Sequence, residues 1–221
     1  MSEQLSFDLP VRTALGRDDF FVSPANAMAL AMIESWPTWA GRKLLLIGPE
    51  GSGKTHLTHV WAALTGAQII PAIDLAHADI PALAQGPVAV EDVPAIAGNP
   101  EAQTALFHLH NLVLAEGQPL LLTGQSEPGL WGLSLPDLLS RLQGTGVARL
   151  DQPDDVLLSA LLAKLFADRQ LTPTPGLITY LTRRIDRSYD AALAIVEQLD
   201  RAALSRGRKL SRALAVEVLE G

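Results

Sequence analysis

The sequence predicts an α/β fold: an αβα sandwich built on a five-stranded parallel sheet, followed by a small all-helical domain. Three observations support this prediction. Short continuous apolar runs recur along the first part of the 221-residue chain, helical patterns separate them, and only helical patterns follow residue 153. Strands buried on both faces show continuous apolar runs, and strands that alternate with helices are typical of parallel sheets covered by helices.

Five runs rich in Leu, Ile and Val are the candidate strands. They span residues 43–47, 67–70, 87–91, 119–123 and 146–150. Between the runs, apolar residues recur at intervals of three and four, which is the spacing of one helix face. This spacing links Leu57, Val60, Trp61 and Leu64, and also Leu106, Leu109 and Val113.

After residue 153 we expect four helices and no strand. Apolar positions 156, 157, 161, 162 and 165 mark the first helix, and similar patterns cover 175–185, 188–205 and 211–219. The charge changes at the same point. Residues 1–163 carry 7 basic and 17 acidic side chains, whereas 164–221 carry 10 basic and 7 acidic ones. Because "LDQPDD" supplies turn residues, we place a domain boundary there, between 13–152 and 153–221.

Composition limits the possible functions. The net charge of −7 argues against a general nucleic-acid binder, which needs a basic surface for phosphate contacts. The absence of cysteine excludes disulfides and thiolate metal sites. No run approaches the ~18 apolar residues of a membrane helix, and the first residues are polar and acidic, unlike a signal peptide. We therefore expect a soluble cytoplasmic protein without membrane contact.

The stretch "LLLIGPEGSGKTHL" contains a phosphate-binding pattern. Gly48, Gly53, Lys54 and Thr55 follow the order G-x-x-x-x-G-K-[ST], directly after one predicted strand and before one predicted helix. Glycines let the loop N–H groups converge on phosphate oxygens, the lysine places a charge beside the β and γ phosphates, and the threonine hydroxyl faces Mg²⁺. The alternative is a chance glycine-rich turn. The predicted nucleotide-binding residues of this loop are Gly48, Pro49, Glu50, Gly51, Ser52, Gly53, Lys54, Thr55 and His56.

A second predicted strand, "VAVEDV", ends in the acidic pair Glu91 and Asp92. A metal ion and an attacking water need carboxylates opposite a phosphate loop. We expect one carboxylate to face the metal and the next to face the water, so that Thr55 and Glu91 are the metal ligands. The alternative is an acidic pair that only closes a strand.

These features together resemble the AAA+ ATPases, and within them the DnaA branch. The segment "RDDFFVSPANAMALAMI" (17–33) is similar to the F-x-x-F-V-x-G-x-x-N stretch that precedes the phosphate loop in DnaA-like proteins and packs near the adenine. The resemblance implies that the ligand is ADP or ATP with Mg²⁺. It also implies that Phe20, Val22 and Asn26 contribute to nucleotide binding.

Two arginines gain expected roles from the same resemblance. The segment "LPDLLSRLQGTG" (135–146) is similar to the one that ends in an arginine finger, which corresponds to Arg141. The segment "RIDRSYDAALAIV" (184–196) resembles the R-E-L-E-G-A-L stretch of the helical lid, so that Arg187 corresponds to the sensor 2 arginine. The resemblance thus implies catalytic roles for Glu91, Asp92, Arg141 and Arg187. Taken alone, Arg141 would be a typical surface ion-pair residue.

The sequence departs from the family pattern at three points. Glu91 stands where an aspartate is usual, Thr123 and Gln125 occupy a stretch that usually offers aspartate or asparagine, and Pro24 interrupts the adenine segment. Gln125 is nevertheless counted among the expected nucleotide-binding residues. Nucleotide binding remains supported, whereas we expect ATP hydrolysis to be weak or dependent on a partner.

The resemblance extends from residue 17 to residue 219. DnaA continues into a helix-turn-helix domain and carries an N-terminal partner domain, and we expect neither in this sequence. What remains resembles the Hda family of small DnaA homologues, whose role is regulatory inactivation of DnaA. That likeness implies three associations: with DnaA, with the β subunit sliding clamp of DNA polymerase, and with further copies of the chain. DNA contact would be indirect, through the clamp.

The stretch "QLSFDLP" at 4–10 lies in an expected flexible peptide, residues 1–12. It is similar to the QLSxxL clamp-binding motif of the Hda family, with Gln4, Leu5, Ser6 and Leu9 in place and Phe7 as a second apolar anchor. A few anchors carry most of the energy of such a contact. The alternative is a terminus that folds back onto its own domain.

Other features remained open. The competing function is a nucleotide-gated adaptor or helicase loader that does not stimulate ATP hydrolysis by its partners. His108 and His110 point to different faces of one helix, so that no metal site is expected, and Trp36 and Trp39 are expected to be packing residues. Basic residues near the C-terminus suit a solvated helix face, with a DNA or partner contact as the alternative: Arg201, Arg206, Arg208, Lys209 and Arg212.

Overall fold

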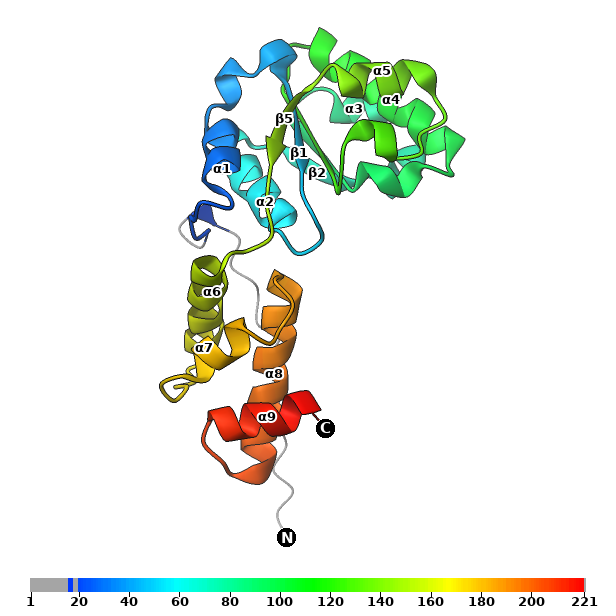
Figure 1. Ribbon diagram of the computed structural model, residues 1–221. Coiled ribbons are helices and arrows are strands. Elements are labelled where there is room, and N and C mark those ends of the chain that lie inside the picture. Colours follow the sequence, from blue (N-terminus) through cyan, green and yellow to red (C-terminus); the bar gives the residue numbers. More distant parts are fainter. Residues whose placement is uncertain (1–15, 18–19, 221) are drawn as a thin grey trace.

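The computed structural model describes residues 16–17 and 20–220, and its sheet has the predicted class. The five strands all pair in parallel, in the order β2-β3-β4-β1-β5 (Figure 1). Every strand begins and ends within one residue of its predicted position. Their bounds are β1 Lys43–Ile47, β2 Gln68–Pro71, β3 Val88–Glu91, β4 Leu120–Gly124 and β5 Gly146–Arg149.

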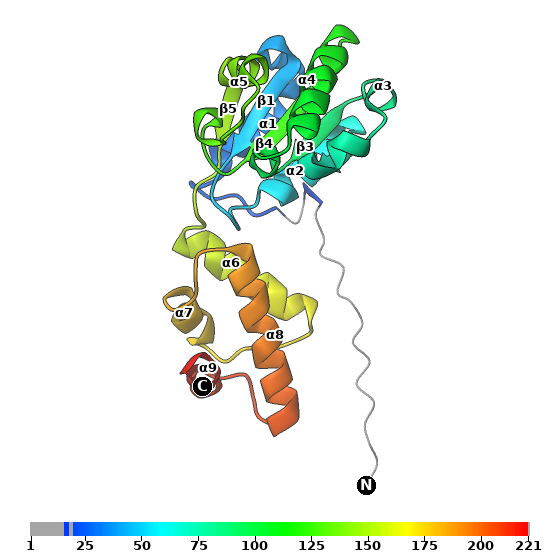
Figure 2. The same cartoon turned by 90° about the vertical axis from the view of Figure 1, so that its right-hand side faces the viewer.

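Helices cover both faces of the sheet, which explains why its strands are apolar throughout (Figure 2). Along β1, Leu45 and Ile47 point into one core and Leu44 and Leu46 into the other. The first core is closed by α3 (Ile80–Leu83), α4 (Pro100–Ala115) and α5 (Pro136–Gln143) together with the 3-10 turn η4 (Ala72–His77), and the second by α1 (Ala27–Glu34) and α2 (Lys54–Thr65).

The predicted apolar face of α2 is confirmed for three of its four residues. Leu57, Val60 and Trp61 are buried, whereas Leu64 is 51% exposed in the last turn of the helix, where the expectation was wrong. The Trp39 ring stacks on Trp61 with centroids 5.4 Å apart, so that Trp39 is a packing residue as predicted.

The strand order brings the ends of the three functional strands together. Because β4 pairs with both β1 and β3, the loops that follow these strands lie side by side at the carboxyl edge of the sheet. Ligands of open parallel sheets bind in the crevice outside the carboxyl ends of the strands. The phosphate-loop sequence follows β1, Asp92 follows β3 and Gln125 follows β4.

Four helices and no strand follow β5 in the described part of the chain, as predicted: α6 Asp155–Asp168, α7 Leu177–Thr182, α8 Tyr189–Arg206 and α9 Arg212–Glu220. They lie beyond one end of the sheet and bury a core of their own (Figure 1). In α6 that core takes Leu158, Leu162, Leu165 and Phe166. Val156, which was assigned to the buried stripe, is 71% exposed, because the stripe begins two residues later.

Two further expectations concern the ends and the environment of the chain. The peptide at 4–9 that is predicted to bind the clamp lies outside the described residues. Within residues 16–17 and 20–220, no helix combines the length and the apolar character needed to span a bilayer.

Candidate functional site

The loop between β1 and α2 takes the shape that its glycines allow. Gly51 and Gly53 have φ of +69° and +97°, a left-handed conformation that glycine adopts without steric cost. Gly48 needs to be glycine for a different reason: a Cβ atom there would lie 2.5 Å from the carbonyl oxygen of Leu150. The loop therefore turns back on itself and delivers the chain into α2 at Lys54.

The Lys54 ammonium lies beneath this loop. Its Nζ donates hydrogen bonds to the carbonyl oxygens of Gly48, at 2.7 Å, and Pro49, at 2.8 Å. Burial lowers the pKa of Lys54, and nearby carboxylates, with Asp92 contributing most, act in the opposite direction. The lysine thus places a positive charge against the backbone of the loop, near the carboxylates of Glu91 and Asp92.

A hydrogen bond to the neighbouring strand fixes the second residue of the acidic pair. Glu91 ends β3, and Asp92 follows with a left-handed φ of +52°. The Asp92 backbone N–H donates to Oγ1 of Thr123, a buried residue of β4, at 2.9 Å. Thr123 therefore orients the backbone that carries Asp92.

A cavity of about 620 Å³ lies over these groups, within the range usual for ligand pockets. It collects most of the predicted site: Glu50, Gly51, Gly53, Lys54, Thr55, His56, Glu91, Asp92 and Gln125 all line it. Thr123 also lines it, together with three residues that the sequence analysis missed, namely Pro71, Tyr189 and Asp190.

Each missed residue had a usable signal in the sequence. Pro71 ends β2, and the carboxyl ends of neighbouring parallel strands face the same crevice. Tyr189 and Asp190 begin α8 two and three residues after Arg187, the arginine that was assigned to the site. Extending both patterns by one to three residues would have found them.

The segment before α1 forms the wall of a smaller recess of about 50 Å³, next to the loop. Phe20 and Asn26 line it opposite Pro153, Leu157 and Tyr189. The Asn26 amide closes the turn, because its Nδ2 donates to the Phe21 carbonyl at 2.8 Å and its Oδ1 accepts from Ser23 N at 2.9 Å.

Of two other predicted residues, Ser52 lines this recess and Val22 does not. Ser52 lines it and is buried, and its Oγ has no hydrogen-bond partner among the described residues. Val22 is 52% exposed and lines neither this recess nor the larger cavity. The recess is apolar on one side and reaches the loop on the other, but at about 50 Å³ it has room for a few water molecules and not for a purine base.

The helical region touches the phosphate loop directly. The Tyr189 backbone N–H, in the first turn of α8, donates to the Gly51 carbonyl oxygen at 3.2 Å. The approach is so close that a Cβ atom on Gly51 would lie 2.2 Å from Cβ of Ser188. A side chain at position 51 would therefore displace the residues that begin α8.

Arg187 lies beside the main cavity and not in its lining. It borders a second cavity of about 540 Å³, which shares Glu50 and Asp190 with the first. Its guanidinium donates to the carboxylate of Asp155 at 2.5 Å and to the Pro153 carbonyl at 3.2 Å. A direct role for Arg187 at the nucleotide stays a prediction.

Arg141 lies at the opposite edge of the sheet from the phosphate loop. Arg141 lies in the last turn of α5, close to Lys43, which is the first residue of β1. The phosphate loop instead follows the last residue of that strand. A five-residue strand is about 16 Å long, which an arginine side chain cannot bridge. The guanidinium lies over the Phe107 ring at 5.3 Å, and Arg141 forms no ion pair within the described part of the chain.

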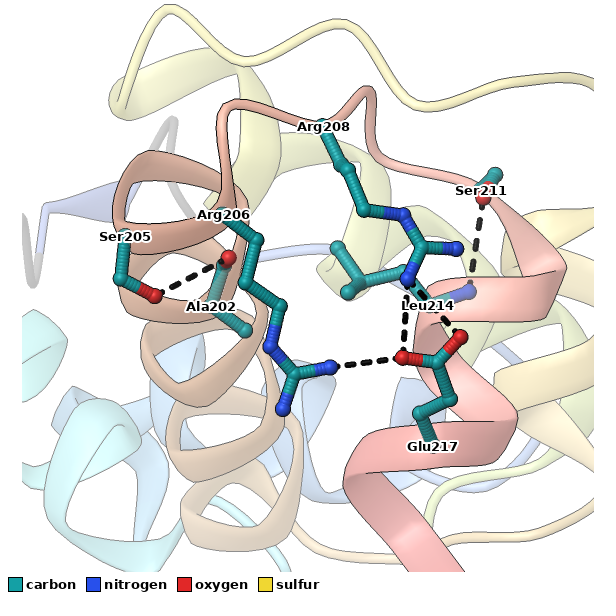
Figure 3. Close-up of polar contacts among 7 residues, drawn as sticks. All are labelled: Ala202, Ser205, Arg206, Arg208, Ser211, Leu214 and Glu217. Atoms are coloured by element: carbon teal, nitrogen blue, oxygen red, sulfur yellow. Dashed lines mark hydrogen bonds and ion pairs between the residues drawn. The ribbon is translucent and has the colours of Figure 1, made fainter.

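The basic residues near the C-terminus are mostly neutralised by the chain itself. Glu217 accepts from Arg206 at 2.6 Å and from Arg208 at 2.8 Å (Figure 3), and Arg201 lies 3.9 Å from Glu197. These ion pairs favour the solvated-face interpretation. Arg212 instead lies over the Tyr180 ring at 5.1 Å.

The carboxylates of the cavity do not form a metal site unaided. Among residues 16–17 and 20–220, no cluster of three or more His, Asp or Glu side chains could hold an ion. The Thr55 hydroxyl and the Glu91 carboxylate are oxygen donors of the kind Mg²⁺ prefers. They fit a magnesium ion whose remaining ligands are phosphate oxygens and water.

Comparison with solved structures identifies the fold. Domain III of the replication initiation protein DnaA from Thermotoga maritima matches with a TM-score of 0.80 and 19% identity, over 96% of this chain and 98% of that one. AMPPCP-bound DnaA from Aquifex aeolicus matches with a TM-score of 0.70 and 17% identity, over 83% of this chain and 64% of that one.

A RuvB variant from Thermotoga maritima also matches, with a TM-score of 0.71 and 17% identity, over 94% of this chain and 72% of that one. No protein-family model matches the sequence. At these identities the likeness establishes the fold, which is the AAA+ α/β fold in the form seen in DnaA domain III.

The close approach of α8 to the loop predicts the effect of adding one methyl group. Gly51→Ala places a Cβ atom against Ser188, so that α8 must move and take Tyr189 and Asp190 away from the cavity. We expect the affinity for ADP to fall about tenfold or more, measured by calorimetric titration. A tenfold change corresponds to about 1.4 kcal/mol.

Gly66→Ala is the matched control. Gly66 has a similar φ, +73°, but nothing within 4 Å of a Cβ atom. Both variants carry the same backbone strain, so that only Gly51→Ala should lose affinity. Equal affinities in the two variants would contradict the proposed coupling of loop and helix.

Proposed function

We propose that the protein is a DnaA-like AAA+ regulator of chromosomal replication initiation, of the Hda type. It would bind adenine nucleotide and the polymerase sliding clamp, and it would stimulate ATP hydrolysis by DnaA through Arg141. The observation that carries this proposal is the position of Arg141, an unpaired guanidinium at the edge of the sheet that its own phosphate loop does not reach. An arginine in that place can act on a nucleotide only when another subunit presents one.

Nucleotide binding has the support of the cavity and its lining. The loop N–H groups and Lys54 would hold the phosphates, and Thr55 and Glu91 would hold Mg²⁺. The recess beside Phe20 and Asn26 adjoins the loop and would have to widen to take the base. The similar DnaA from Aquifex aeolicus was solved with AMPPCP bound. When bound, a triphosphate supplies a phosphoanhydride bond that can be hydrolysed.

We expect ATP bound at this site to be hydrolysed slowly. Asp92 is the candidate for orienting a water, and its backbone is held by Thr123 and not by a charged group. Glu91 carries one methylene more than the aspartate expected at its position. In this proposal the bound nucleotide mainly sets the position of α8 through Gly51, and so the shape in which the protein meets its partners.

Arg141 would supply positive charge to a partner's nucleotide. Phosphoryl transfer develops charge on the γ-phosphate oxygens, and an arginine offered by a second protein can raise the rate 10³–10⁵-fold. Because the Arg141 side chain rests on Phe107, and no carboxylate of the described chain pairs with it, it remains available to an incoming phosphate.

The clamp would bring the protein to DNA. Gln4, Leu5, Ser6, Phe7 and Leu9 are the proposed contacts, and contact with DNA itself would be indirect. Association with DnaA, and of the chain with itself, would bring Arg141 to a neighbouring nucleotide. As a regulator of chromosome replication the protein would act in the cytoplasm.

The charge balance of the cavity predicts a requirement for magnesium. Four carboxylates, from Glu50, Glu91, Asp92 and Asp190, line it with a single lysine, and a polyphosphate adds further negative charge. Chelation of divalent cations with EDTA should lower the ATP affinity at least tenfold, and more than it lowers the ADP affinity. Titration of a fluorescent nucleotide measures both.

Asp190→Asn should reduce this requirement, because it removes one carboxylate that is not a candidate metal ligand. If ATP binds equally well with and without EDTA, the proposed magnesium site is wrong.

The proposed finger is tested with Arg141→Ala. At saturating protein, in the presence of clamp loaded on DNA, we expect the variant to lose stimulation of ATP hydrolysis by DnaA by about 100-fold or more. Binding to the clamp and to ADP should not change. Arg201→Ala, which removes an exposed arginine of α8, is the control and should stimulate normally. Unchanged stimulation by Arg141→Ala would overturn the proposal.

Clamp binding is tested independently of hydrolysis. Gln4→Ala and Leu5→Ala remove two anchors and should each weaken binding to immobilised clamp about tenfold or more, because anchor residues carry most of such an interface. Ser2→Ala lies outside the motif and should bind like the wild type. Clamp binding without stimulation would favour the competing adaptor function.

A further inference from the structure

Arg141 and the three residues beside it come from three separate elements. Phe107 and His110 lie three residues apart on α4, and so on one face of that helix. Lys43 begins β1, and Arg141 lies in the last turn of α5. These four residues form the group called here the Arg141 support. None of Lys43, Phe107 and His110 was assigned a function by the sequence.

Lys43 contacts Arg141 through the backbone. Its Nζ donates to the Arg141 carbonyl oxygen at 3.1 Å, and Oγ1 of Thr145 donates to the same oxygen at 2.8 Å. Carbonyl groups in the last turn of a helix have no partner within the helix, and a cation there is favoured by the helix dipole. Lys43 therefore ties the end of α5 to the first residue of β1.

His110 holds Lys43 in turn. The distance between Lys43 Nζ and His110 Nε2 is 3.3 Å. His110 is buried, and burial in the first place, followed by the charge of Lys43, lowers its pKa to about 4. The ring is therefore neutral near pH 7, and a neutral imidazole with its proton on Nδ1 accepts a hydrogen bond from an ammonium at Nε2.

The side chain of Arg141 is held separately from its backbone. Its guanidinium lies over the Phe107 ring at 5.3 Å, a contact that orients a cation without neutralising it. Neither Lys43 nor Arg141 pairs with a carboxylate in the described residues. Burial and the neighbouring Arg141 charge both lower the pKa of Lys43. Two like charges without a counter-ion repel each other, and an incoming anion would relieve that repulsion.

We propose that Lys43 is a positioning residue for Arg141, and that with His110 and Phe107 it holds the guanidinium at the angle in which it meets a phosphate group of the partner subunit. This inference deepens the proposed function and rests on it. Catalytic groups must be held within a fraction of an ångström of their productive position, and a misplacement of about 1 Å can cost about 100-fold in rate. Lys43 would act through Arg141 and would not touch the substrate.

The test compares Lys43→Met with its neighbour Arg42→Gln. Methionine keeps an unbranched side chain that is one atom shorter, and it removes both hydrogen bonds. Arg42 lies at the same edge of the sheet, but its guanidinium donates to the Gly117 carbonyl and not to Arg141. Each variant is added in increasing amounts to ATP-bound DnaA with clamp on DNA. The maximal hydrolysis rate and the concentration for half-maximal effect are then measured.

A positioning role predicts a specific pattern. Lys43→Met should lower the maximal rate about tenfold or more and leave the half-maximal concentration within about twofold, because the surface is kept and only the angle of Arg141 changes. Lys43→Arg keeps a cationic donor and should retain more of the rate. Arg42→Gln should match the wild type. The ADP affinity of each variant should be unchanged, since the phosphate loop lies at the other end of β1.

Three outcomes would overturn the inference. The first is that Lys43→Met stimulates like the wild type. The second is that it loses ADP affinity and stimulation together, which would indicate a general structural role. The third is that the double variant of Lys43→Met and Arg141→Ala is weaker than Arg141→Ala alone, which would show that Lys43 acts independently. Failure of the proposed function is recognised separately, because Arg141→Ala would then leave stimulation intact.

Discussion

The structure depends on the burial of β1 in the middle of a parallel sheet. Leu44, Leu45, Leu46 and Ile47 pack into two cores at once, while β4 and β5 take up the backbone hydrogen bonds on either side. Because both ends of such a strand are fixed, whatever follows or precedes it has a fixed place. The phosphate loop follows the strand, and Lys43 precedes it. One strand therefore sets the distance between the group that holds a nucleotide and the group proposed to act on another.

The contact between the loop and α8 involves main chain on both sides. The Tyr189 N–H meets the Gly51 carbonyl, and the lack of a side chain on Gly51 permits the approach. Tyr189 and Asp190 then enter the cavity lining from the helical region. A ligand in this cavity would touch the sheet and the helices together. A ligand that differs by one phosphate can thus change the position of the helices relative to the sheet without a large change within either part.

The sequence was sufficient for the sheet, the phosphate loop and the acidic pair, because each depends on residues close together in the chain. Strands buried on both faces have a continuous apolar pattern. The spacing of the glycines between a strand and a helix is typical of a phosphate-binding loop. Contacts across the fold were not predictable in this way. The hydrogen bond from Asp92 to Thr123, the ion pair of Arg187 with Asp155, and the support of Arg141 by Lys43 join residues more than thirty positions apart. Leu64 and Val156 were misplaced because a helix end may leave an apolar residue in solvent.

The distribution of tryptophan and tyrosine along the chain, of which Trp39 and Trp61 are part, has a practical consequence. The four tryptophans, at 36, 39, 61 and 131, all precede the helical region, while both tyrosines, 180 and 189, belong to it. Emission excited at the red edge of the absorption band therefore comes from the sheet part alone, and excitation energy passed from tyrosine to tryptophan crosses between the two parts. Energy transfer from tyrosine to tryptophan therefore reports the separation of the two parts without an added dye, and Tyr189 lies at the point where the two parts meet.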